Sequence, residues 1–306
     1  MQLASNLEEI LPRKAWMAFS RDSGLSGVGC APAEDPRFPA ALRLVVSPPD
    51  SLWYVGRLPQ PAEPLFAVVG ARAATRSGCD RAFEIARGLT RTGAAIVSGG
   101  AFGIDAAAHE GSLAEGSPTF AVLGCGADVV YPDRHRQLFA RIAKTGGLLS
   151  EYPPGTPPRR GQFPARNRLI AALAKAVIVV EAAFRSGALI TAKLARDLGR
   201  PLFAVPGSPG TDALVRAGYA VSASTAEDVL RVLAGEKLEP PSLTEVPERF
   251  AAILDAIGLG LNSPADLCKH VGMALPSLLA ALAEAELEGL VKRAVGNSYE
   301  VIGREY

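Results

Sequence analysis

The sequence predicts an α/β protein with a doubly wound parallel β-sheet, followed by a small C-terminal domain. Between residues 65 and 205, short apolar and β-branched runs alternate with amphipathic stretches of about three or four turns. This alternation is typical of parallel βαβ units. After residue 247 it stops, and three short helical stretches precede one hairpin.

Each predicted element follows from a local pattern. The strands are apolar runs that end close to a glycine, a carboxylate or a proline, at 65–70, 94–98, 119–124, 147–151, 176–181 and 201–205. The helices have apolar residues at helical spacing, at 76–91, 104–115, 134–144, 166–173 and 187–198. Right-handed crossovers place the loops that follow these strands at one edge of the sheet, where such folds bind ligands.

Composition divides the chain into four parts. Residues 1–60 are a short N-terminal lead-in, and residues 61–235 form the sheet domain. Residues 236–246 are charged and contain proline without periodicity, which predicts a linker. Residues 247–306 form the last domain, with helices expected at 247–257, 263–271 and 275–288 and hairpin strands at 290–294 and 299–302. Three helices followed by a hairpin predict a winged-helix domain.

The charge distribution points to a polyanionic partner. The net charge is +1, but residues 65–235 carry 20 Lys and Arg against 13 Asp and Glu, a net +7. Residues 236–306 carry 6 against 11, a net −5. A basic domain inside a nearly neutral chain is typical of nucleic-acid binding. On charge alone, an ordinary scatter of surface arginines explains the same excess equally well.

The remaining composition excludes several classes of protein. The four cysteines and three histidines have no metal-ligand spacing, so we expect neither a disulfide framework nor a zinc site. The N-terminus lacks the form of a signal peptide, and no apolar run reaches membrane length. We therefore expect a soluble cytoplasmic protein.

A glycine-rich turn at residues 98–109, SGGAFGIDAAAH, is the strongest local signal. An apolar strand runs into Ser98 and two glycines, and an alanine-rich helix follows. In this arrangement, backbone N–H groups and the positive end of a helix dipole point into the same small space. Such a space can bind a phosphate. Asp105 at the start of the helix is either part of such a site or simply a helix cap.

Four arginines lie in or just after a loop that is expected at the same edge of the sheet as the glycine-rich turn. Arg159 and Arg160 precede the helix expected at 166–173, and Arg166 and Arg168 lie in its first turn. A cation there is unfavourable to the helix dipole unless an anion or a buried carboxylate offsets it. A bound phosphate would do so, and so would Glu151 or Glu181.

The sequence contains few of the motifs and residue combinations that form catalytic sites. The first strand is followed by GARAATR rather than G-x-G-x-x-G, and there is no P-loop lysine. No Ser–His–Asp or Cys–His set can be assembled, and His109 and His135 are expected to be structural or solvent-facing. We therefore expect a binding protein that is not an enzyme and has no cofactor or metal.

Seven motifs, in order, closely resemble the DNA-processing protein A (DprA/Smf) family. They are VVGARAATRSG, SGGAFGIDAAAH, VLGCGADVVYP, LLSEYPPGTPP, FPARNRLIAAL, VIVVEAAFRSGALITA and LFAVPGSPGTDALV, within residues 36–233. The resemblance implies an extended Rossmann-like domain, a C-terminal winged helix as in some members, and no enzymatic activity. It also implies a homodimer that binds and protects single-stranded DNA and loads RecA recombinase during natural transformation.

The resemblance implies a set of DNA-binding residues. In the G-x-R, glycine-turn, R-N-R and S-G-x-L-I-T-A motifs these are Gly70, Arg72, Arg76, Ser98, Gly99, Gly103, Arg166, Asn167, Arg168, Ser186, Gly187 and Thr191. Asp133 stands where the family usually has a basic residue, so Arg134 or Arg136 is expected to replace it. Asp212 stands in place of the family's asparagine.

Two other functions compete with this interpretation. A nucleoside-monophosphate hydrolase on a related Rossmann-like scaffold would carry P-G-G-x-G-T and a catalytic glutamate, whereas PGSPGTDAL here has no following glutamate. A double-stranded DNA regulator would read DNA with the helix at 275–288. That helix has three glutamates and no Lys or Arg, so we expect a protein-contact module there.

Overall fold

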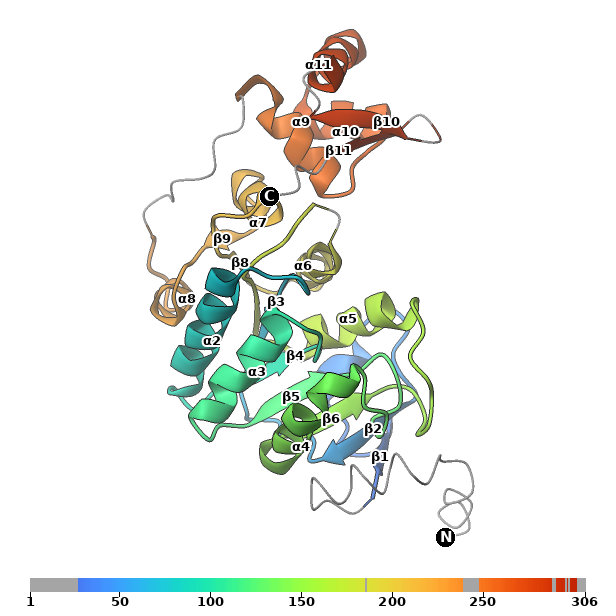
Figure 1. The fold of residues 1–306 in the computed structure, drawn as a ribbon, viewed down its shortest axis with the longest axis vertical. Coiled ribbons are helices and arrows are strands. Elements are labelled where there is room, and N and C mark those ends of the chain that lie inside the picture. The colour runs from blue at the N-terminus through green and yellow to red at the C-terminus, as the bar shows by residue number, and fades with distance from the viewer. Residues whose placement is uncertain are drawn as a thin grey trace.

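A nine-stranded, mostly parallel sheet forms the main domain (Figure 1). The computed structural model describes residues 27–184, 186–238, 248–287, 290–294, 296 and 298–301. The strands are β1 (Gly29–Pro32), β2 (Ser51–Gly56), β3 (Leu65–Val69), β4 (Ala95–Ser98), β5 (Thr119–Val122), β6 (Gly147–Ser150), β7 (Ala176–Val179), β8 (Leu202–Ala204) and β9 (Val221–Ser222). Their order in the sheet is β1-β2-β6-β5-β4-β3-β7-β8-β9.

The strand order creates a switch point at the centre of the sheet. From β3 the chain adds β4, β5 and β6 on one side, and then returns to place β7 on the other side of β3. Both β3–β4 and β3–β7 are parallel pairs. The loops after β3 and β7 therefore leave the sheet in opposite directions and open a crevice between them, which is where doubly wound sheets bind ligands.

Helices cover both faces of the sheet. They are α2 (Arg76–Thr90), α3 (Ile104–Ala114), α4 (Arg136–Thr145), α5 (Gln162–Leu173), α6 (Gly187–Asp197), α7 (Pro209–Arg216) and α8 (Ala226–Leu233). In β3, Leu65, Ala67 and Val69 pack on one side with α5 and α6. Phe66 and Val68 pack on the other with α2 and α3. All five residues are buried, as expected of a parallel strand that is covered on both faces.

The predicted fold class is confirmed, with corrections to its elements. The lead-in does not end as a separate unit near residue 60, because β1 and β2 extend the sheet as antiparallel strands beyond β6, with β1 at the edge. Helix α5 begins at Gln162, a full turn before the predicted residue 166. Arg166 and Arg168 therefore lie beyond its first turn, and the dipole argument does not apply to them. The short elements α7, β9 and α8 were not predicted.

The C-terminal domain has the predicted arrangement of three helices and a hairpin. Helices α9 (Glu248–Gly258), α10 (Pro264–Val271) and α11 (Leu275–Leu287) pack with strands β10 (Val291–Ala294) and β11 (Ser298–Val301). Ser263 caps α10 through a hydrogen bond from the N–H of Asp266, 3.1 Å long. Leu278 and Leu282 are fully buried, whereas Leu275 and Leu279 are exposed. Asn297, which was expected with Gly296 to join the two hairpin strands, lies outside the described residues. No described helix is both long and apolar enough to cross a membrane.

Helix α3 buries a neutral histidine beneath the sheet. His109 is fully buried, and its Nδ1 lies 2.7 Å from Thr119 Oγ1. Because the Thr119 hydroxyl donates to the Ile96 carbonyl, Nδ1 is the donor of this contact. Nε2 is buried without a hydrogen-bond partner among the described residues. Burial, with the neighbouring His135 and Arg166, lowers the pKa of His109 to about 3. The histidine is thus structural, one of the two roles that the sequence predicted.

We predict that His109 makes stability depend on pH below about 6.5. Its pKa is lower in the folded than in the unfolded chain, so the unfolded chain binds the extra proton between these values. The contribution of His109 to the free energy of unfolding is then fully present above the pKa of the unfolded chain. Below that pKa it falls by about 1.4 kcal/mol per pH unit. Urea unfolding at pH 7 and at about pH 5 should show a loss near 2 kcal/mol from this group, and His109→Gln should remove that part. An unchanged pH dependence in the variant would contradict the assignment.

Candidate nucleic-acid interface

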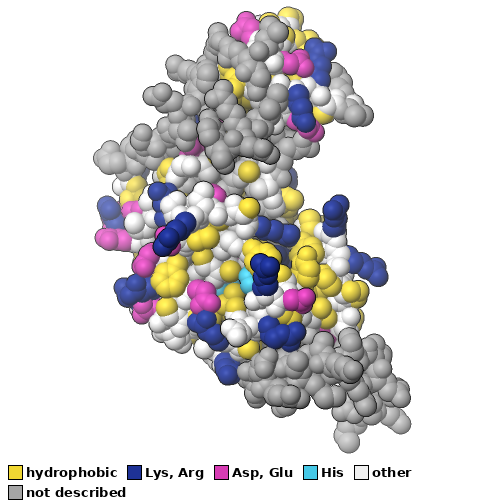
Figure 2. Space-filling view, viewed as in Figure 1, with side chains coloured by type: hydrophobic (Ala, Val, Ile, Leu, Met, Phe, Trp, Pro, Cys, Tyr) yellow, Lys and Arg dark blue, Asp and Glu magenta, His cyan; other side chains and the backbone are white. Residues whose placement is uncertain are grey.

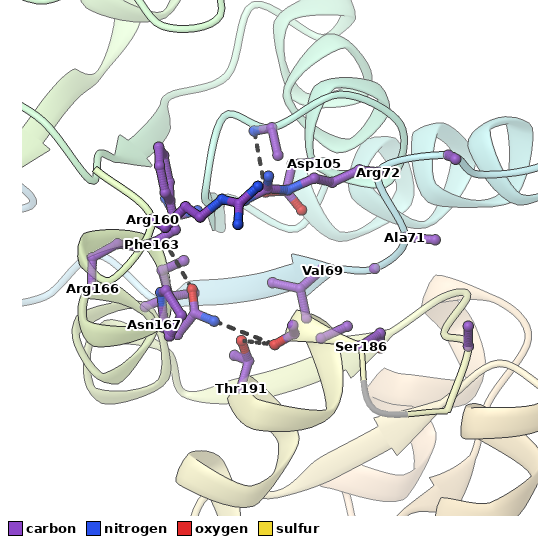
Figure 3. Close-up of a pocket in the computed structure, with 18 of the residues that line it drawn as sticks. Val69, Ala71, Arg72, Asp105, Arg160, Phe163, Arg166, Asn167, Ser186 and Thr191 are labelled. Atoms are coloured by element: carbon purple, nitrogen blue, oxygen red, sulfur yellow. Dashed lines mark hydrogen bonds between the residues drawn. The ribbon is translucent and has the colours of Figure 1, made fainter. Parts of the chain in front are cut away.

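A pocket of about 610 Å³ opens at the switch point between β3 and β7. Its walls come from the loop after β3, the start of α3, the N-terminal half of α5 and the segment that leads into α6 (Figure 3). Residues far apart in sequence, such as Arg72, Phe163 and Thr191, therefore line one cavity.

Arg166 forms the buried base of one wall. It is 4% exposed, and its guanidinium donates to the Gly99 carbonyl at 2.7 Å, to Asn167 Oδ1 at 3.0 Å and to the Val122 carbonyl. Burial lowers the pKa of Arg166 to about 10, and the neighbouring Asp105 opposes this fall. The group stays charged at neutral pH and contributes positive potential to the pocket.

Asp105 holds the glycine turn in place. Its Oδ2 accepts hydrogen bonds from the N–H of Gly99 at 3.1 Å and of Ala101 at 3.3 Å. Burial raises the pKa of Asp105, and the Arg166 charge opposes the rise. Gly103, with a φ of 73°, is the N-cap residue of α3, so Asp105 is not its cap. Two N–H groups that the sequence offered to a phosphate are therefore already engaged by a carboxylate, which corrects the expected use of this turn.

Two exposed arginines lie at the mouth of the pocket. Arg72 extends from the loop after β3 toward α5, with its guanidinium 5.2 Å from the centre of the Phe163 ring (Figure 3). Arg160 precedes α5 on the opposite wall. Within the described parts of the chain, neither has a carboxylate partner. On the face in Figure 2, Lys and Arg side chains lie around exposed hydrophobic side chains of the main domain.

Aromatic and small polar groups complete the lining. The rings of Tyr131 and Phe163 are 5.5 Å apart and tilted by 40°. Across the pocket, α6 begins after Ser186, whose hydroxyl is buried without a hydrogen-bond partner in the described structure. Asn167 donates to the Gly187 carbonyl at 3.3 Å, and Thr191 donates to it at 3.4 Å. The Asn167 bond joins α5 to α6, whereas the Thr191 bond lies within α6.

The structure brings together half of the predicted DNA-binding residues. Those that line the main pocket are Gly70, Arg72, Arg166, Asn167, Ser186, Gly187 and Thr191. Gly99 lines an adjoining hollow with Phe102 and Tyr131. The direct role of each in DNA contact stays a prediction.

The other predicted residues lie outside the pocket lining. Arg168 pairs with Glu151 through two hydrogen bonds of 2.6 Å. Of the two predicted partners for this arginine, a phosphate or a carboxylate, the structure thus shows the carboxylate. Ser98 is buried and donates to the Val68 carbonyl at 2.7 Å. Gly103 packs against the backbone of the loop after β3. Arg76, Arg134 and Arg136 do not line the cavity.

Sequence reasoning missed Arg160 and Phe163 as site residues. The sequence indicated Arg160 only as a cation that precedes a helix, and it gave no prediction for Phe163. An aromatic residue three positions before Arg166 was the available signal, since aromatic and basic side chains together form nucleic-acid surfaces. No group of three or more His, Cys, Asp or Glu side chains among the described residues could hold a metal ion.

Both domains of the chain match known protein families. Residues 30–234 match the family model for DNA recombination-mediator protein A, and residues 237–297 match the DprA winged helix domain. Protein Smf of Synechocystis is 48% identical over 58% of this chain, and a putative DNA processing protein DprA of Mycobacterium tuberculosis is 41% identical over 79%. The chain spans 45% and 66% of the length of these two relatives.

Two solved structures share the fold. DNA processing protein A from Streptococcus pneumoniae has a TM-score of 0.64 and 38% identity, and the match covers 70% of this chain and 76% of that one. DNA processing protein A from Helicobacter pylori, described for its single-stranded DNA binding mode, has a TM-score of 0.62 and 31% identity. That match covers 70% of this chain and 98% of the other.

We predict that Asp105 is far more important to stability than a surface carboxylate of the same helix. Asp105→Asn leaves the buried Arg166 charge without its anionic neighbour, which should cost about 3 kcal/mol of unfolding free energy. The control is Glu110→Gln, which breaks an exposed 2.8 Å pair with Arg141 and should cost less than about 0.5 kcal/mol. Urea unfolding at neutral pH measures both. Equal losses would show that Arg166 does not depend on Asp105.

Proposed function

The chain belongs to the DNA recombination-mediator protein A family, and on this premise we propose that it binds single-stranded DNA in the pocket between β3 and β7. The observation that supports this most directly is the pair of exposed arginines, Arg72 and Arg160, at the mouth of a cavity with an aromatic wall. Guanidinium groups bind phosphates, and aromatic rings stack on bases of any sequence. We therefore expect weak sequence preference.

The proposal extends to recombination. We infer that the bound strand is protected and that RecA recombinase is loaded onto it by a homodimer of this protein in the cytoplasm during natural transformation. Family membership supports these roles, as does the H. pylori relative described for its binding of single-stranded DNA. Light scattering of the purified chain, with and without an oligonucleotide and RecA, tests the dimer and the complex together.

We predict that Arg72 and Arg160 each contact a phosphate. For an oligo-dT strand, log affinity should fall with log salt by about 0.7 per phosphate contact. Arg72→Ala and Arg160→Ala should each weaken binding and reduce that slope by about 0.7. Fluorescence anisotropy over a range of salt concentrations measures both quantities.

The matched control is Arg91→Ala, which removes the same charge at the opposite edge of the sheet. Arg91 ends α2 just before β4 and pairs with Glu115 at 2.9 Å. Its affinity and slope should equal those of the unmodified chain. A normal slope in Arg72→Ala would remove that arginine from the site.

We also propose that the protein has no catalytic turnover. No His, Cys or Glu is present in the described lining, and its one carboxylate, Asp105, is engaged by backbone N–H groups and lies beside Arg166. Incubation with nucleoside monophosphates, ATP or labelled DNA should therefore leave each of them intact. Release of free base in proportion to protein concentration would instead support the hydrolase.

A further inference from the structure

Helix α9 of the winged-helix domain is joined to α7 of the main domain by a buried ion pair. Asp255 on α9 accepts from Arg216 Nε at 2.6 Å and from Arg216 Nη2 at 2.7 Å. The Asp255 side chain is 5% exposed and that of Arg216 is 20% exposed. A paired arginine and carboxylate with two parallel hydrogen bonds fixes orientation as well as distance. The pair therefore sets how α9 lies on α7 (Figure 1).

A second contact lies at the C-terminal end of α9. Gly258 packs directly against the ring of Phe184, so closely that a Cβ atom at this position would overlap the ring. The adjacent Leu259 packs on the main hydrophobic core. Near α10, Tyr219 Oη lies 3.2 Å from His270 Nδ1. The winged-helix domain thus contacts the main domain at several separate points.

Phe184 links this interface to the pocket. It lies between Ala183 and Ser186, which both line the cavity. The same segment is held at its start by α7, because the N–H of Gly210 donates to the Ala182 carbonyl at 2.8 Å. Helix α7 therefore anchors one end of the segment, and α9 covers its aromatic side chain.

We propose that the winged-helix domain positions the wall of the pocket formed by Ala183 and Ser186. Helix α9, fixed by the Arg216–Asp255 pair, holds the Phe184 ring and so limits the movement of its neighbours. All lining residues in the described structure belong to the main domain, so this effect acts through Phe184 and not through contact with the ligand. Asp255 and Phe184 are positioning residues. The inference uses the proposed DNA binding as its readout.

Two variants of the full chain separate this role from direct DNA contact. Asp255→Asn weakens the ion pair from the winged-helix side, and Phe184→Ala removes the ring from the main-domain side while Arg216 and Asp255 remain. Each should weaken oligo-dT binding about fivefold, the cost of ordering about one released side chain. The salt slope should not change, because no phosphate contact is lost. X-ray scattering should show a larger radius of gyration for Asp255→Asn alone.

The control is Lys292→Ala on the exposed hairpin, where Lys292 lies 3.5 Å from Glu300. Its affinity and salt slope should equal those of the unmodified chain. If Asp255→Asn fails to fold, as judged by circular dichroism, Phe184→Ala still tests the proposal.

The outcomes distinguish the two proposals. If the unmodified chain does not bind the oligonucleotide, the proposed function fails. If it binds and Phe184→Ala binds equally well, the positioning role is overturned. Tighter binding by the variants overturns it also, since the contact of α9 with Phe184 would then oppose DNA binding instead of supporting it. A reduced salt slope in Lys292→Ala or Asp255→Asn would mean that the winged-helix domain contacts DNA directly.

Discussion

The pocket depends on one buried charge, the guanidinium of Arg166. Removing an ion from water costs several kcal/mol unless the surrounding groups replace the lost hydrogen bonds. Here the carbonyls of Gly99 and Val122 and the side chain of Asn167 do so, while Asp105 supplies the opposite charge. Gly99 itself has no room for a Cβ atom, since that atom would overlap the Arg166 guanidinium. The glycine turn, the start of α3 and the middle of α5 are therefore constrained by the same group.

This constraint divides the arginines of the main domain into two kinds. Arg166 and Arg168 stabilise the fold, the second by binding Glu151 and the Ser47 carbonyl. Arg72 and Arg160 have no such partners in the described structure and face the cavity. Both arginines of the R-N-R stretch are therefore engaged by the fold, and the two exposed arginines of the pocket come from the loops before α2 and α5.

The sheet could be predicted from sequence because burial on both faces leaves long apolar strands, such as 65–69 and 176–179, between helices. Strands β1 and β2 could not, since Gly29–Pro32 and Ser51–Gly56 are partly exposed and lack the burial on both faces that leaves a continuous apolar run. The start of α5 lies before the predicted residue because Gly161 provides no side-chain cap to mark it, and Pro164 fits within the first turn of the helix. The burial of Arg166 could not be predicted either, since nothing local distinguishes a buried arginine from an exposed one.

The same electrostatics explain why the pocket suits an anion. Burial lowers the pKa of Arg166, Asp105 opposes this fall, and the like charge of Arg72 adds to it. Asp105, which also holds the glycine turn, carries one negative charge and so cannot offset both guanidinium groups. A phosphate at the mouth would offset the remaining positive charge, and the aromatic wall at Phe163 would accept a base without selecting its identity. The arrangement that stabilises the fold therefore leaves a surplus of positive charge, and that surplus lies where the switch point of the sheet opens to solvent.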